Sequence, residues 1–135
     1  MNSLIFIRHG ETDMDGKFCG HSDPELNAAG ELQVARVAEE VANLGVERIY
    51  SSDLRRAAQT AAVLGRRIGV EVELRDSLRE IYFGLWEGLS WQEIETRFPQ
   101  EACLTLARVS RRRPLKRSAD SRATWKICWL RFPET

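Results

Sequence analysis

The 135-residue chain is poor in the residue types that cross-link a protein or embed it in a membrane. Its three cysteines, Cys19, Cys103 and Cys128, are odd in number, widely spaced and without metal-ligand spacing. We therefore expect reduced thiols rather than a disulfide framework. No apolar run approaches the length of a membrane-spanning helix, and the run before Arg8 is too short for a signal peptide. These absences favour a cytoplasmic protein with no membrane partner.

The chain also lacks net charge, because two segments of opposite charge cancel. Residues 1–101 contain 11 Lys and Arg against 18 Asp and Glu, whereas residues 102–135 contain 9 against 2. Such a split is typical of a basic tail or of segments with different origins. The basic run at residues 111–117 could attract nucleic acid or an anionic surface. It lacks an aromatic stacking pattern and any known nucleic-acid motif, so we do not expect a nucleic-acid partner.

Apolar patterns in the first hundred residues alternate between the periods of strands and helices. Residues 3–7, 46–50 and 70–74 have the pattern of short strands, and residues 28–43 and 54–68 that of amphipathic helices. Strands that alternate with helices are the signature of an α/β fold. We expect a mostly parallel sheet with helices on both faces, a truncated version of a three-layer α/β/α architecture.

Polar residues mark where the expected helices begin. Asn27 and Asp53 are candidate N-caps for the two long helices. Ser90 and Glu93 have the spacing of a capping box for a short helix that ends near Pro99. In the first helix, the apolar residues that fall near one face are Leu32, Ala35, Val37, Ala38 and Val41.

The agreement between local signals ends near residue 101. Residues 111–118 have neither a helical nor a strand period, and the apolar residues at 125–132 lack clear caps or turns. We therefore divide the chain into an α/β domain at residues 1–101 and a basic tail at residues 102–135. The tail is expected to pack poorly and to be cut by protease first.

The strongest functional signal follows the first expected strand. There the chain turns at Arg8, His9 and Gly10, and His9 is one of only two histidines. Loops at strand ends of α/β folds bind ligands. Arg can hold a phosphate through two parallel hydrogen bonds, His is a nucleophile near neutral pH, and Gly allows close approach. Together they indicate a phosphate site that contains a nucleophilic imidazole.

Three further motifs follow this turn in a fixed order. The four segments are Arg8–Thr12, Gly20–Leu26, Ser51–Ala61 and Leu78–Gly88. Their order and composition resemble the histidine phosphatase superfamily, which includes cofactor-dependent phosphoglycerate mutases and α-ribazole phosphatases. The resemblance covers roughly the first hundred residues, and four ordered motifs make it far more specific than any single one.

The resemblance implies a role for each matching residue. His9 corresponds to the nucleophile that becomes phosphohistidine, and Arg8 and Arg56 to the arginines that grip the phosphate oxygens. Glu80 corresponds to the acid that protonates the leaving oxygen. Many relatives carry Asn where this chain has Asp15 in a phosphate-facing loop, and a carboxylate there would repel phosphate. The favoured interpretation is a member that acts on small phosphorylated metabolites without a metal ion, and we expect no cofactor here.

The residues alone leave plainer interpretations open. His9 could be a turn residue with a satisfied hydrogen bond, and Arg56 and Glu80 could be solvated surface charges. We assign Arg56 from the motif and expect the neighbouring Arg55 at the surface. His21 is expected to be a loop residue rather than a ligand. Trp86 and Trp91 are expected to pack rather than to stack on substrate.

One family feature has no counterpart in the chain. Members carry a second essential histidine in a His-Gly context on a later strand, and no histidine follows His21. A truncation or frameshift near residues 101–103 would account for this absence and for the basic tail.

The resemblance implies a phosphomonoester hydrolase that acts through phosphohistidine. The segment Phe83–Gly88 favours the phosphatase branches, with the α-ribazole phosphatase of cobalamin synthesis the nearest. A phosphoglycerate mutase and a catalytically impaired remnant of the family are the alternatives. The sequence does not indicate an oligomeric state.

Overall fold

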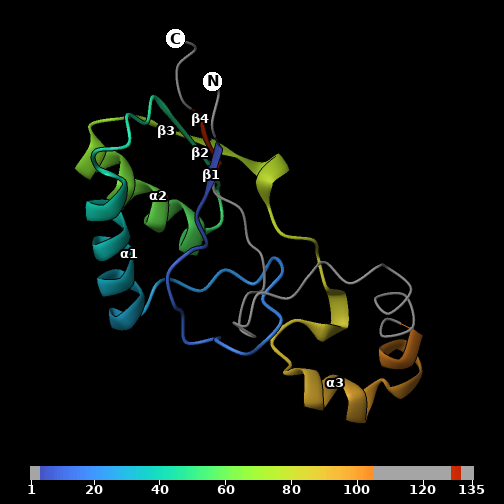
Figure 1. Cartoon of the computed structure of the whole chain (residues 1–135). Coiled ribbons are helices and arrows are strands. Elements are labelled where there is room, and N and C mark those ends of the chain that lie inside the picture. Colours follow the sequence, from blue (N-terminus) through green and yellow to red (C-terminus); the bar gives the residue numbers. More distant parts are fainter. Residues whose placement is uncertain (1–3, 105–128, 132–135) are drawn as a thin grey trace, which may run out of the picture.

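The computed structural model describes residues 4–104 and 129–131, and a four-stranded sheet lies at its centre (Figure 1). The strands are β1 (Leu4–Phe6), β2 (Arg48–Ser52), β3 (Val72–Arg75) and β4 (Trp129–Arg131), in the order β1-β4-β2-β3. β2 and β3 are parallel, whereas β4 is antiparallel to both β1 and β2. The three predicted strands therefore run in the same direction within one sheet. β2 and β3 each begin two residues later than predicted.

Two helices cover one face of this sheet. They are α1 (Ala28–Val41) and α2 (Arg55–Ile68), which pack against each other and lie on the same side of the strands in Figure 1. One shared core joins them to the sheet through Ile7, Ala38, Val41, Val46, Ile49, Ala61 and Leu64.

The predicted α/β fold is confirmed, and in the described part of the chain both long helices lie on the same face of the sheet. The strands β1, β2 and β3 follow one another in one direction across the sheet. Right-handed crossovers between such strands place both connecting helices on the same face. The opposite face carries Leu4 and Phe6, whose side chains are about half exposed.

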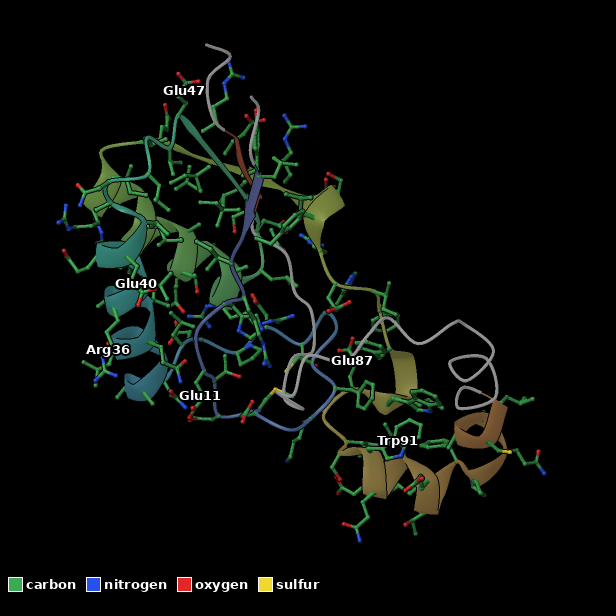
Figure 2. All side chains as sticks on the ribbon, viewed as in Figure 1. Glu11, Arg36, Glu40, Glu47, Glu87 and Trp91 are labelled. Atoms are coloured by element: carbon green, nitrogen blue, oxygen red, sulfur yellow. The ribbon has the colours of Figure 1, made fainter. Side chains whose placement is uncertain are left out.

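The start of α1 follows the predicted cap, but its buried face is rotated from the predicted one. The side chain of Asn27 accepts a hydrogen bond from Gly30 N at 2.8 Å, as an N-cap does. The buried residues of α1 are Gly30, Val34, Ala38 and Val41. The prediction for Leu32 was wrong, because it lies off this stripe and is 65% exposed. Figure 2 shows Arg36 on the side of α1 turned away from the sheet.

The start of α2 differs from its prediction. The N-cap is Leu54, and the predicted cap, Asp53, instead binds the guanidinium of Arg79 through both carboxylate oxygens. Asp23, which is distant in sequence, accepts a hydrogen bond from Arg55 N at 2.6 Å. This contact ties the segment after Gly20 to the first turn of α2. The Arg55 side chain is exposed, as predicted, and pairs with Glu25.

Two 3-10 turns and a short helix follow β3. They are η1 (Asp76–Leu78), η2 (Gly84–Trp86) and α3 (Trp91–Arg97), and residues 99–104 are also helical. The predicted capping box is confirmed, because Ser90 Oγ accepts from Glu93 N while the Glu93 carboxylate accepts from Ser90 N. α3 lies apart from the sheet in Figure 1.

An aromatic cluster joins this region to the loop after β1. The Phe18 ring lies 5.0 Å from that of Phe83, 6.1 Å from Trp86 and 6.2 Å from Trp91, centroid to centroid. Phe18 N also donates to Leu89 O at 2.9 Å. Trp86 and Trp91 therefore pack against other rings, as predicted, and Figure 2 shows Trp91 beside α3.

The predicted basic tail is mostly outside the described residues. Of residues 102–135, the structure describes 102–104 and the backbone of β4. The prediction that this tail packs poorly therefore stays a prediction. No helix of the described segments is both long enough and apolar enough to cross a membrane.

Candidate active site

A cavity of about 340 Å³ lies beside the turn that follows β1. Its wall combines this turn, the loop at residues 14–17 and the facing sides of α1 and α2. The polar side chains in the lining are Arg8, His9, Glu11, Thr12, Asp15, Lys17, Gln33 and Thr60. The cavity therefore presents an imidazole and two cationic side chains together with two carboxylates.

The imidazole of His9 is held in one tautomer by its own turn. His9 Nδ1 lies 2.7 Å from the carbonyl oxygen of Gly10, and a carbonyl oxygen can only accept. Nδ1 therefore carries the proton, and in the neutral ring the lone pair is on Nε2. The Nε2 atom is shielded from solvent. This is the tautomer that a nucleophilic Nε2 requires.

Both long helices hold the turn in place. Gly10 N donates to Thr60 Oγ1 at 3.1 Å, and Thr60 Oγ1 donates to Arg56 O at 2.8 Å on α2. On the other side, Gly10 touches the first turn of α1 so closely that an added Cβ would lie 2.6 Å from Gly30 O. The position of His9 is thus set by two buried contacts to its neighbour.

Arg8 and Asp15 lie at the exposed side of the cavity. Their side chains are 42% and 69% exposed, and Arg8 Nη2 is 4.0 Å from Asp15 Oδ1. At that exposure the ion pair contributes little to stability. The carboxylate nevertheless offsets part of the positive charge that Arg8 offers to an anion.

Arg56 is the most deeply buried charged residue in the described part of the chain. It is 2% exposed, and its guanidinium donates from Nη1 to Ser22 O at 2.7 Å and from Nη2 to Gly20 O at 2.9 Å. No carboxylate of the described residues forms an ion pair with it. A buried guanidinium bound only by neutral carbonyls is costly without an anion nearby.

Glu80 lies in the segment between η1 and η2 and is half-buried. Its Oε1 accepts from Ile81 N at 3.1 Å. Its backbone oxygen accepts from His21 Nε2 at 2.9 Å, so His21 is a loop residue that contacts protein groups, as predicted.

Sequence reasoning assigned no role to Glu87, which the structure makes a central hydrogen-bond acceptor. Its carboxylate accepts from His21 N, Ser22 N, Ser22 Oγ and Phe83 N. Burial raises the pKa of Glu87, but these hydrogen bonds outweigh it and hold the pKa below its ordinary value. Three of the donors are 65 or 66 residues away, so no local pattern could have identified this role.

The structure brings three of the five predicted site residues to one cavity. Arg8, His9 and Asp15 line it, whereas Arg56 and Glu80 do not. Arg56 is connected to it through Thr60, as described above. The convergence of all the predicted residues on one bound phosphate stays a prediction. Within the described residues, no group of three or more His, Cys, Asp or Glu side chains is arranged to hold a metal ion.

Comparison with known proteins identifies a family for nearly the whole chain. The family model of the histidine phosphatase superfamily (branch 1) matches residues 4–123. The chain is 39% identical over 98 residues to the glucosyl-3-phosphoglycerate phosphatase of Mycobacterium tuberculosis (strain CDC 1551 / Oshkosh), a match that covers 71% of this chain and 44% of that protein. The match to the family model extends beyond residue 101. The division of the chain into a domain at residues 1–101 and a tail at residues 102–135 stays a prediction.

Solved structures give the same result. A mycobacterial glucosyl-3-phosphoglycerate phosphatase in complex with VO3 superposes with a TM-score of 0.70 at 37% identity, covering 77% of this chain and 50% of that one. A putative alpha-ribazole-5'-P phosphatase from Escherichia coli superposes with a TM-score of 0.69 at 26% identity, covering 79% and 55%. The chain thus spans about half the length of these relatives.

Proposed function

The chain belongs to the histidine phosphatase superfamily, and from this premise we propose that it is a phosphomonoester hydrolase with His9 as nucleophile. One observation carries the proposal. The hydrogen bond from His9 Nδ1 to Gly10 O leaves the lone pair of the neutral ring on Nε2, in a cavity that Arg8 also lines. Small phosphorylated metabolites fit a cavity of about 340 Å³ with this lining.

The proposed reaction has two steps. His9 Nε2 attacks phosphorus, the phosphorus–oxygen ester bond breaks, and the Glu80 carboxyl donates its proton to the departing alkoxide oxygen. Water then attacks the phosphohistidine, the phosphorus–nitrogen bond breaks, and the water proton returns to Glu80. Phosphate leaves and the neutral imidazole is restored.

The arginines supply the charge that this transfer needs. A phosphomonoester dianion repels a nucleophile, so cationic groups must offset its charge in the transition state. Arg8 is on the cavity wall, and the buried Arg56 is one turn of α2 before Thr60, which also lines the wall. A bound phosphate would provide the anion that Arg56 lacks among the described residues.

Trapping of the covalent intermediate tests the proposal. The full 135-residue chain is mixed with a generic aryl phosphate, quenched in alkali, and analysed by mass spectrometry for one added phosphoryl group. We expect the group on the wild-type chain and on His21→Ala, and its complete loss in His9→Ala. Labelling of His9→Ala, or an acid-stable adduct typical of a phosphoserine, would overturn the assignment.

The substrate is proposed only as a class. We test α-ribazole phosphate, because the phosphatase-type segment Phe83–Gly88 favours it, beside phosphoserine and 3-phosphoglycerate. A phosphatase releases inorganic phosphate from its substrate, whereas a mutase would yield an isomer of phosphoglycerate instead. The ratio of kcat/KM values selects among them.

We expect slow turnover from this 135-residue chain. It has no histidine after His21, so a donor that the family places on the transferring phosphoryl group is missing. Loss of one such donor typically lowers the rate by about 100- to 1000-fold. Turnover of roughly 1 per second or faster that His9→Ala abolishes would contradict this expectation.

A further inference from the structure

We infer that Glu87 is a positioning residue that holds Arg56 in place through the backbone of residues 20–22. The inference rests on the proposed function, because it assigns to Glu87 the placement of a phosphate-binding arginine. Glu87 and Arg56 do not touch each other. Glu87 instead accepts from backbone N–H groups of residues 20–22, and Arg56 donates to backbone carbonyl oxygens of the same segment.

The first link is the peptide group between Gly20 and His21. Its carbonyl oxygen accepts from Arg56 Nη2 at 2.9 Å, and its N–H donates to Glu87 Oε1 at 2.7 Å. A peptide group with a cation at its oxygen and a carboxylate at its N–H is polarised by both in the same sense. Each hydrogen bond therefore strengthens the other.

The second link is Ser22. Its backbone N–H and its hydroxyl both donate to Glu87 Oε2, at 2.8 and 2.7 Å. Its carbonyl oxygen accepts from Arg56 Nη1 at 2.7 Å. Both nitrogens at the tip of the Arg56 guanidinium are thus bound to carbonyls of residues 20–22, and Glu87 accepts from the N–H groups of the same segment.

Close packing leaves this segment little freedom. Gly20 has φ +46°, and an added Cβ would lie 2.9 Å from Phe83 Cδ2 and closer still to Glu87 Oε1. Figure 2 shows Glu87 where the loop after β1 meets the segment that leads to α3. The carboxylate therefore sits directly against the backbone whose position it sets.

The same carboxylate also reaches the segment that carries the proposed acid. Glu87 Oε1 accepts from Phe83 N at 3.4 Å, and the His21 ring donates to Glu80 O at 2.9 Å. Residues 20–22 are thus held between Arg56 on α2 and the chain around Glu80. Loss of the Glu87 carboxylate is expected to release both.

Three variants separate positioning from general stability. Glu87→Gln keeps the shape but replaces one acceptor oxygen with an NH₂ group, which faces N–H or hydroxyl donors whichever way the amide turns. Ser22→Ala removes one hydroxyl donor and leaves the backbone donors intact. The control is Glu39→Gln, which makes the same chemical change at an exposed carboxylate that pairs with Arg67.

The first measurement needs no ligand. Amide hydrogen exchange at His21 and Ser22, in the full chain, is expected to accelerate strongly in Glu87→Gln, weakly in Ser22→Ala and not at all in Glu39→Gln. A double-mutant cycle pairs Glu87→Gln with Arg56→Lys. We expect the effects of the two substitutions on the unfolding constant to depart from additivity by a factor between about two and a hundred, although the two side chains are not in contact.

The second measurement is the affinity for orthovanadate, a phosphate analogue. We expect Glu87→Gln to weaken it by up to about a hundredfold, Ser22→Ala to weaken it less, and Glu39→Gln to leave it unchanged. Additive unfolding effects, or unchanged vanadate affinity in both Glu87→Gln and Ser22→Ala, would overturn the inference. A wild-type chain that binds no vanadate would overturn the proposed function instead, and the ligand-free measurements distinguish that outcome.

Discussion

The replacement of Gly30 by alanine separates helix propensity from tertiary packing, because the two effects have opposite signs. Gly30 lies in the first turn of α1 and is buried against the backbone of Glu11. Propensity alone favours alanine over glycine within a helix by about 1 kcal/mol. An added Cβ, however, would lie 2.7 Å from Glu11 N and nearer still to Glu11 O.

The geometry sets the size of the expected loss. Ordinary contact begins near 3.4 Å, so Glu11 N would have to move by about 0.7 Å and the closer Glu11 O by more. Overpacking typically costs about 1–3 kcal/mol, and the still closer Glu11 O places this site in the upper part of that range, at about 2–3 kcal/mol. The gain in propensity of about 1 kcal/mol offsets part of this cost. We therefore expect Gly30→Ala to lower the free energy of unfolding by about 1–2 kcal/mol. The shift is passed to Gly10 and His9, so vanadate affinity is expected to fall as well.

Denaturant unfolding with a constant m-value measures the stability change. Ala29→Gly is the matched control, because it is an exposed position in the same turn. It is expected to lose up to about 1 kcal/mol through propensity alone and to keep the vanadate affinity of the wild-type chain. If Gly30→Ala is as stable as the wild-type chain or more so, the close approach of α1 to the turn is refuted.

Three further expectations concern the site. Thr60→Val leaves Gly10 N–H buried without its acceptor, so we expect it to lower the free energy of unfolding by about 1–3 kcal/mol and to speed hydrogen exchange of the Gly10 amide. Thr60→Ser keeps the hydroxyl and should keep the wild-type exchange rate. Equal exchange in the two variants would count against the Gly10–Thr60 hydrogen bond. Asp15→Asn should raise vanadate affinity at low salt, since it removes the negative charge beside Arg8, and an unchanged or lower affinity in titration calorimetry would contradict this. The pKa of Glu87 lies below its ordinary 4.5, so its stabilising contribution is present above that pH and is lost as the pH falls through the lowered value. Unfolding followed across this range should show a shallower acid loss in Glu87→Gln, and parallel curves would refute the role of this carboxylate.

The position of His9 illustrates what the sequence indicates and where it stops. The strand before it and the turn at Gly10 were predicted from a short apolar run and a glycine. The acceptor that holds its tautomer is the neighbouring carbonyl, and such local contacts follow from chain geometry. The hydroxyl of Thr60, which fixes the turn, is 50 residues away from Gly10. No spacing rule relates the two positions.

The two helix caps show the same division. Asn27 caps α1 with its own side chain, three residues before the amide it binds, and the sequence was sufficient to predict it. At α2 the same reasoning selected Asp53, but the Asp53 carboxylate accepts hydrogen bonds from Arg79 instead. Asp23 accepts from Arg55 N in the first turn of α2. An aspartate caps a helix only when no stronger partner is nearby, and that depends on the tertiary structure.

The sequence by itself determined the family, the identity of the proposed nucleophile and the order of strands and helices in the first hundred residues, because these depend on ordered motifs and on hydrogen bonds between near neighbours. It did not predict β4, which lies between β1 and β2. Tertiary structure alone decided that both long helices share one face and that Arg56 turns toward Gly20 and Ser22. It also brought Glu87 to the far side of the same backbone. These contacts join residues 34 to 66 positions apart. Which of many possible partners meets a buried charge is settled only when the chain has packed around it.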